Sequence, residues 1–520
     1  MKKKLLVIGL IVVLAFGMTA CGGGDDEDTS GKTNLSIIDS EWYGIDTYQL
    51  DSTASYQALT SSSLFQWNPE TNEMEDNVCT DWKVSEDGKT ATFNVPEGMY
   101  YSTGEQVEPE DVVASIEHGL DVSPYKDGYS NIESMDVDGR QVTLHLSEFR
   151  SDMQYYLCAG FVIVIDKDEL DSMSNEELMW GCHPYGMFSL AEENGYVSGS
   201  EVNLVRNDKY KCANPLVENQ GPSHFETVNV RFNVEDFTAI EELKSGTVDI
   251  LGVVTNDGKM ELEGTDGITM ADATYPNITY FEMNTDSGIF SDINVRKAFA
   301  LSIDREALAE GYDNLIAPAY SMIYDSVQNF SQDAKDWFQE NLANDPDQAK
   351  ELLDKAGWKD TDGDGIREKD GEKLSFTWYA WTDSTTIPEM MAEQVKEVGF
   401  EMNIEAIDWN YVYENINSDD YDAGIEWLSW AEPMLVLNGC YYDQNAPGND
   451  DEYYEMVEDA ATTVDSDERT EKVGEIQMRI FENVNMIPMY AELGFVAYNS
   501  DLQGFNVLAD GTTPLNDLAY

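Results

Sequence analysis

One strand–helix–strand pattern near the middle of the chain constrains the fold most strongly. Residues 227–234 alternate apolar and polar side chains, which is typical of a strand. Asp236 can cap a helix over 237–244, Gly246 can end it, and residues 248–253 then read as a second strand. Strand, helix and strand over this length form a βαβ unit, whose strands lie parallel in one sheet. The pattern therefore predicts an α/β fold.

A second α/β region follows about a hundred residues later. Asp345 and Pro346 can begin a helix that Gly357 ends. A further helix is expected over 388–398, and residues 400–406 alternate like a strand. Because 520 residues are too many for one hydrophobic core, we expect two or three domains.

The charge of the chain excludes some classes of partner. It carries 101 acidic and 30 basic residues, a formal net charge of -71. Nucleic-acid binding needs a basic face, so no nucleic-acid partner is expected, and direct binding to anionic lipid is disfavoured for the same reason. The acids are spread along the whole chain, which favours a solvated, self-repelling surface over selection of cationic ligands.

The cysteines form no recognised metal or redox motif. Besides Cys21 there are five, an odd number, so at least one stays unpaired within the chain. A bridge between Cys182 and Cys212 is left open, and burial in the reduced state is expected for the others. The five are Cys79, Cys158, Cys182, Cys212 and Cys440.

No constellation of catalytic residues is visible, so the chain is not expected to be an enzyme and no cofactor or metal is assigned. The four histidines lack the spacing of a zinc-protease helix, and neither a nucleophile elbow nor a phosphate-binding glycine loop is present. His183 precedes Pro184 and is expected to be structural. Carboxylates are so abundant that a glycosidase pair can be neither chosen nor excluded.

One segment partly matches a calcium loop. Residues 360–366 place acids at loop positions one, three and five and glycine at six, but position twelve is Gly371 rather than a glutamate. We favour a polar turn here and leave weak calcium binding open.

The first twenty residues have the layout of a secretory signal. Lys2 to Lys4 are basic, residues 5–16 are apolar and too short to span a bilayer, and small residues lead to Cys21. The segment resembles a bacterial lipoprotein signal, although Met18 stands where that signal usually has leucine. The resemblance implies cleavage after residue 20 and a lipid on Cys21. Residues 21–33 would then form a flexible linker, on a protein anchored outside the cytoplasm. An ordinary cleaved signal is the alternative.

A series of motifs in sequence order resembles a known family, the large solute-binding proteins of ABC transporters, of the peptide, dipeptide and nickel class. The pair of predicted helix caps at Asp292 and Asp304, with Val295-Arg296 and Ile303-Asp304-Arg305, is the most specific match. The motifs lie at residues 82–93, 96–105, 110–113, 181–185, 206–210 and 292–305.

The resemblance implies a two-lobed α/β fold of the periplasmic-binding-protein type (class II, cluster C) with an extra inserted N-terminal lobe. A ligand would lie in the cleft between the main lobes, which close on it by hinge bending. The implied ranges are 34–67, 185–273 and 489–520 for lobe one, 68–184 for the inserted lobe, and 274–488 for lobe two.

The resemblance also implies ligand contacts. In the family an aspartate often pairs with the amine of a bound peptide, and here that position falls on Ser429, within 426–433. The aspartate is therefore missing, with Glu426 or Glu432 as the alternative substitute, which places a standard free peptide in doubt. The expected contacts are Tyr280, Asn284, Trp427, Ser429, Trp430, Glu432 and Tyr441.

The expected function is a lipid-anchored, monomeric receptor of an ABC importer, which captures a small ligand, closes on it and delivers it to a membrane permease. Peptide is the leading ligand class and an oligosaccharide or another small solute is the alternative. A surface hydrolase such as a glycosidase, or a sensor or adhesin, represents the rival classes.

Overall fold

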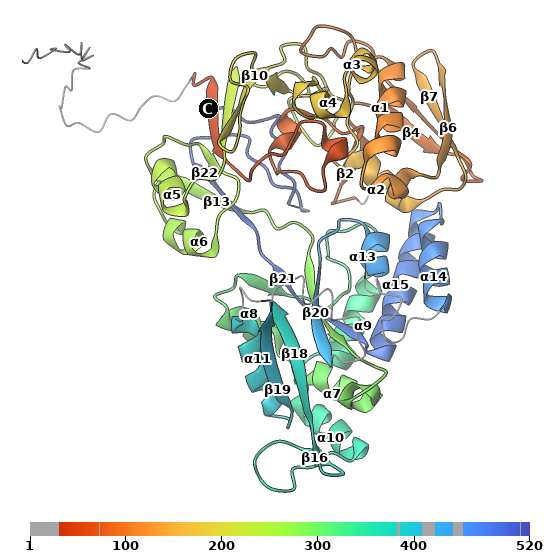
Figure 1. Ribbon diagram of the computed structural model, residues 1–520, viewed down its shortest axis with the longest axis vertical. Helices are drawn as coiled ribbons and strands as arrows, with labels where there is room; N and C mark the ends of the chain where they lie inside the picture. The colour runs from red at the N-terminus through yellow and green to blue at the C-terminus, as the bar shows by residue number, and fades with distance from the viewer. Residues whose placement is uncertain (1–30, 72, 382–384, 408–421, 440–450, 510) are drawn as a thin grey trace, which may run out of the picture.

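The computed structural model describes residues 31–71, 73–381, 385–407, 422–439, 451–509 and 511–520, and its strands gather into two large sheets and several small ones (Figure 1). The two large sheets lie at different levels along the long axis of the molecule, one in each main lobe. Within the described part of the chain, no helix has both the length and the apolar character needed to cross a membrane.

Lobe one is built on an eight-stranded sheet with the order β13-β22-β12-β1-β11-β10-β8, with β9 beside β10. Helices α5 (Asp236–Lys244) and α6 (Asn256–Leu262) belong to this lobe. Its strands are β1 (Asn34–Ile38), β8 (Phe188–Leu190), β9 (Tyr196–Val197), β10 (Glu201–Arg206), β11 (Thr227–Arg231), β12 (Ile250–Leu251), β13 (Ile268–Asp272) and β22 (Phe495–Asn499).

The predicted βαβ unit is confirmed, with one strand inserted into it. Strand β1 lies between β11 and β12 and runs parallel to both. Both strands are shorter than predicted, and β11 ends before Asn233, whose φ of 58° breaks the extended backbone. The predicted cap at Asp236 is wrong, because α5 begins at Asp236 itself and Glu235 is its N-cap.

The inserted lobe contains a four-stranded antiparallel sheet with the order β4-β5-β7-β6. A β2–β3 hairpin (Phe65–Asn68 and Glu73–Asp76) leads into it. Its elements are β4 (Thr80–Val84), β5 (Thr90–Asn94), α1 (Pro109–Val122), β6 (Ile132–Asp138), β7 (Gln141–Leu146), α2 (Ser151–Cys158), α3 (Lys167–Ser172) and α4 (Asn175–Gly181).

Lobe two is built on a six-stranded sheet with the order β15-β21-β14-β20-β18-β19, surrounded by helices (Figure 1). Its strands are β14 (Ile278–Met283), β15 (Ile316–Pro318), β18 (Ser375–Trp381), β19 (Glu401–Ile407), β20 (Ala423–Leu428) and β21 (Met486–Glu492), besides the small β16 (Glu368–Lys369) and β17 (Glu372–Lys373). Its helices are α7 (Ile293–Ser302), α8 (Arg305–Gly311), α9 (Gln332–Leu342), α10 (Pro346–Ala356), α11 (Thr386–Lys396), α13 (Pro433–Gly439), α14 (Asp451–Ala461) and α15 (Ser466–Asn483).

The helix signals read in lobe two are confirmed by local hydrogen bonds. Asp345 accepts from the backbone N–H of Gln348 at the start of α10, and Gly357 ends that helix with a φ of 90°. Asp292 and Asp304 cap α7 and α8 in the same way. These caps satisfy backbone donors that a helix cannot satisfy by itself, which is why short local signals sufficed to find them.

Two neighbouring segments carry the chain between lobe one and lobe two. The backbone N–H of Ala273 donates to the carbonyl of Gly494 over 2.9 Å, and the N–H of Gly494 donates to Thr274 Oγ1. A β-carbon at Gly494 would lie 3.0 Å from the Ala273 carbonyl oxygen, so the close approach favours glycine. Strand β21 runs across the expected boundary at 488 and pairs throughout with the strands of lobe two.

Cys182 and Cys212 do not form a disulfide bridge. Both are buried free thiols, as are Cys79 and Cys158. Burial raises the pKa of the Cys182 thiol well above its ordinary value, which keeps it protonated and unreactive.

Candidate functional site

A pocket of about 390 Å³ lies where lobe two meets the rest of the molecule. Pro69 of the β2–β3 hairpin and Ala509 of the C-terminal segment line one side of it. The loop between β15 and α9 lines the other side, together with Ile278 of β14 and Ala491 of β21. Lobe two lines one side of the pocket, and segments outside lobe two line the other side. Movement of the lobes relative to each other would therefore change the shape of the pocket.

The polar groups of this pocket come mainly from the segment before α9. Lys335 of α9 forms an ion pair with Asp325, and both side chains line the pocket. Burial, followed by the nearby Asp272 and Asp325 carboxylates, raises the pKa of the half-buried Tyr324 phenol. Tyr324 therefore stays neutral at physiological pH. The pocket thus combines two aromatic rings, those of Tyr320 and Tyr324, with one positive and one negative group.

A buried arginine supports the floor of the pocket. The Arg305 guanidinium lies 5.8 Å from the ring centre of Tyr320, a lining residue, and donates from Nε to the Pro488 carbonyl over 2.9 Å. Desolvation lowers the pKa of Arg305 to about 10, so it remains charged at neutral pH. Tyr320 donates from its hydroxyl to Glu306 Oε1 over 3.2 Å, and burial followed by this carboxylate raises its pKa to about 12.

A second pocket of about 610 Å³ adjoins the first along the edge strand β15. The two share Ala317 and Pro318, so both lie beside this strand, and together they are called the groove below. Glu306 and Glu310 of α8 give the second pocket an acidic wall.

Two of the residues predicted to contact ligand lie in structural positions. Tyr280 is 1% exposed in the core of lobe two, and its hydroxyl donates to the Met322 carbonyl over 2.7 Å. Asn284 follows β14, is buried, and accepts from the N–H groups of Asp286 and Ser287 through Oδ1. Neither residue lines the groove.

The shortened motif after β20 lies against other parts of the molecule. Trp427 is 40% exposed at the end of β20, and Ser429 donates to the Pro276 carbonyl over 3.3 Å. Trp430 packs edge-to-face on Tyr125 of the inserted lobe, with ring centres 6.0 Å apart.

Glu432, another residue predicted to contact ligand, has a buried carboxylate that is bonded within the protein. Its side chain is fully buried, and the two oxygens accept from Ser151 Oγ and from the Leu435 N–H. Tyr441 and Cys21 lie outside the described residues.

Several residues of the groove are absent from the ligand contacts that the sequence predicts. Tyr320, Tyr324, Asp325 and Lys335 are separated in the chain from every motif used to predict the site. The available signal was two tyrosines in a segment outside any predicted element, where side chains are free to serve binding.

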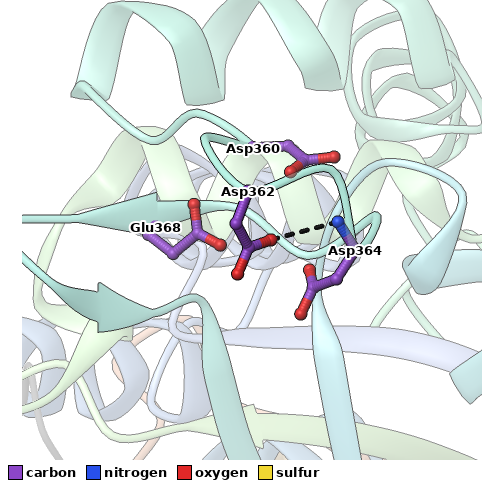
Figure 2. A group of neighbouring side chains, drawn as sticks. All are labelled: Asp360, Asp362, Asp364 and Glu368. Atoms are coloured by element: carbon purple, nitrogen blue, oxygen red, sulfur yellow. Dashed lines mark hydrogen bonds between the residues drawn. The ribbon is translucent and has the colours of Figure 1, made fainter.

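The acidic loop at 360–366 does bring its carboxylates together (Figure 2). Oxygens of Asp360, Asp362, Asp364 and Glu368 all lie within 4.8 Å of one another, so Glu368 of β16, at loop position nine, joins the three aspartates. The same carboxylates accept from loop N–H groups, as in the 3.1 Å bond from Asp364 to Asp362, and Asp364 also pairs with Lys373. These bonds are those of the favoured polar turn.

Comparison with known proteins agrees with the fold and with the motifs. The family described as bacterial extracellular solute-binding proteins, family 5, matches residues 73–448. The oligopeptide-binding protein AppA of Bacillus subtilis is 22% identical, over 97% of this chain and 96% of its own.

Solved structures share the fold over nearly the whole chain. The structure of Bacillus subtilis AppA with a nonapeptide has a TM-score of 0.66 at 19% identity, covering 95% of this chain and 100% of that one. The structure described as a nickel ABC transporter from Bacillus halodurans has a TM-score of 0.76 at 21% identity, covering 94% and 100%. With two lobes, an inserted lobe and the family match over most of its length, the chain belongs to the bacterial extracellular solute-binding proteins of family 5.

Proposed function

We propose that this protein is the peptide receptor of an ABC importer. It binds its ligand in the groove beside β15, closes its lobes around it and delivers it to a membrane permease. The proposal rests on one observation: Pro69 and Ala509 line one side of the pocket, and residues of lobe two line the other side. Relatives named as oligopeptide-binding proteins support peptide as the ligand class.

The chemistry of the groove suits a zwitterionic, extended ligand. Asp325 and Lys335 offer opposite charges, which can exchange their mutual ion pair for the charged groups of a peptide. The Tyr324 ring offers apolar contact area beside them. Trp427, 40% exposed at the end of β20, does not line the groove either, and its contact with ligand stays a prediction.

Peptide binding is tested by isothermal titration of the full chain, purified in detergent, with a nonapeptide of mixed sequence. Asp325→Asn should weaken affinity by about tenfold, because it removes the charge that a ligand ammonium would meet. Asp333→Asn is the matched control, since this exposed aspartate of α9 does not line the pocket. Equal affinities of the two variants would contradict the assignment of the groove.

Mass spectrometry of the same samples separates the alternatives. Intact peptide should be recovered after denaturation. Recovery of an oligosaccharide in place of peptide would contradict peptide as the ligand class. Cleavage of peptide or glycan would contradict a receptor function and would indicate a hydrolase.

We also propose that a lipid on Cys21 anchors the protein outside the cytoplasm, as a monomer. Its lobes would follow the residue ranges given above, except that lobe two would include the whole of β21, to Glu492. The tether would raise the effective concentration of the receptor at its permease. Cys21→Ala should move the protein from the membrane to the soluble fraction while leaving peptide affinity unchanged. Thr29→Ala, in the same linker, is the control and should stay with membranes. Membrane association of the cysteine variant would contradict the anchor.

A further inference from the structure

The inserted lobe touches lobe two through the start of helix α2. Figure 1 shows α2 above helices α13 and α15. Ser151 Oγ donates to Glu432 Oε1 over 3.2 Å, joining residues 281 positions apart. At the rim of the contact, Arg150 pairs with Glu458 of α14 over 2.9 Å. Two parts of the fold that are distant in sequence are thus joined by polar side chains.

Glu432 lies at the centre of this contact with 0% exposure. Besides Ser151 it accepts from the Leu435 N–H over 2.8 Å. The nearby arginines are engaged elsewhere: Arg150 bonds Asp152 and Glu458, while Arg469 donates to the Asn329 side chain and the Thr463 carbonyl. The carboxyl group is therefore buried without an arginine donating to it, an environment that favours its neutral form.

Charged and titratable groups face Glu432 from each element packed against it. Burial, followed by the negative charge of Asp152, raises the pKa of Glu432 well above its ordinary range, and Arg469 offsets this only partly. Burial also raises the pKa of Asp152, against the opposing effect of Arg150. The groups are Asp152, Tyr155 and Tyr156 from α2, Arg469 from α15, and Arg150 and Glu458 at the rim.

We propose that Ser151, Asp152 and Glu432 form a latch between the inserted lobe and lobe two, and that closing the latch takes up a proton on Glu432. With both carboxyl groups ionised, closure would bury two like charges side by side. With Glu432 protonated, the neutral carboxyl keeps its bond with Ser151 and the repulsion disappears. The latch goes beyond ligand binding and can be observed without a ligand.

The sign of the pH dependence follows from the raised pKa. When the latch is open, Glu432 meets water and titrates near the ordinary glutamate value of 4.5. The closed form binds the proton more tightly, so its stability is fully present below that value and is lost as pH rises through the pKa of the closed form. For one proton, the closing equilibrium changes by up to about tenfold per pH unit in this window.

Hydrogen exchange of the full chain in detergent measures latch opening. Protection of residues 151–158 and 432–439 is followed from pH 5.5 to 8.5, with exchange times scaled to the intrinsic rate at each pH. In the wild type, protection of both segments should fall as pH rises. In Glu432→Gln, which mimics the neutral carboxyl, protection should stay high and lose its pH dependence.

Two further variants keep the test decisive. Glu455→Gln removes an exposed acid of α14 while leaving the Arg150–Glu458 pair in place, and it should follow the wild type. Ser151→Ala keeps both central carboxyl groups but lacks the bridging hydroxyl, so protection should be lower at every pH. Flat protection in the wild type, a wild-type slope in Glu432→Gln, or wild-type protection in Ser151→Ala would each overturn the latch.

Discussion

Replacing Phe281 by alanine should destabilise lobe two by about 4 kcal/mol. Phe281 is a fully buried residue of β14, and its ring stacks on Phe299 of α7 with centres 4.3 Å apart. It also lies 5.5 Å from the Trp378 ring of β18, so it joins a helix to two strands of the sheet. Truncation removes these contacts and leaves a cavity that close-packed neighbours cannot fill. Urea unfolding followed by tryptophan fluorescence measures the loss of unfolding free energy.

Phe237→Ala is the matched control for this measurement. Phe237 of α5 in lobe one is 70% exposed, so its truncation should change the unfolding free energy by less than about 0.5 kcal/mol. The two lobes can unfold in separate steps, and the loss should appear in one transition only. Similar losses for Phe237 and Phe281 would contradict the packing described for lobe two.

Replacing Arg305 by alanine should cost about 3 kcal/mol. The side chain is 2% exposed, lies over the Phe338 ring at 5.0 Å, and donates to the Pro488 carbonyl of β21. Its removal leaves a space between α8 and α9 and a buried carbonyl that loses a donor. Thermal unfolding by circular dichroism is the measurement, and peptide affinity should fall with it because Arg305 supports Tyr320 in the groove.

The effect of pH on the stability loss in Arg305→Ala distinguishes the contribution of Arg305 from that of other titratable groups. Desolvation lowers the pKa of Arg305 to about 10, so the unfolded chain holds this proton more tightly. The effect of this titration on stability therefore varies only above about pH 10. Between pH 6 and 9 the loss in Arg305→Ala should therefore be constant. Arg206→Ala, which removes a partly exposed arginine paired with Asp208, should cost less than about 1 kcal/mol. A comparable loss of unfolding free energy in Arg206→Ala and Arg305→Ala would contradict the stabilising role described for the buried Arg305.

Local signals in the sequence predicted many helix ends because their physics is local. A cap is formed between residues two or three positions apart, as Asp345 and Gln348 show. The same holds for Gly357, whose left-handed backbone favours glycine. The strands around α5 were predicted too long, since alternation continues past Asn233 in the sequence although the backbone turns there.

Contacts between lobes depend on residues that are far apart in the sequence. The sequence predicts ligand contacts in the segment from Trp427 to Glu432, and the structure shows that Trp430 and Glu432 of this segment pack against the inserted lobe. Which face of a segment meets a neighbouring lobe depends on contacts between residues hundreds of positions apart. Neither residue type nor spacing records those contacts.

The α/β class, the two separate sheet regions and the family motifs can all be recognised in the amino-acid sequence. Periodicity and capping act over a few residues, so they can be read along the chain. Only the tertiary structure decided where the groove lies, because its walls come from Pro69, from the segment before α9 and from Ala509. It also decided the state of Glu432: burial beside Asp152 sets the proton affinity of this carboxyl group, and that burial exists only once the lobes are packed together.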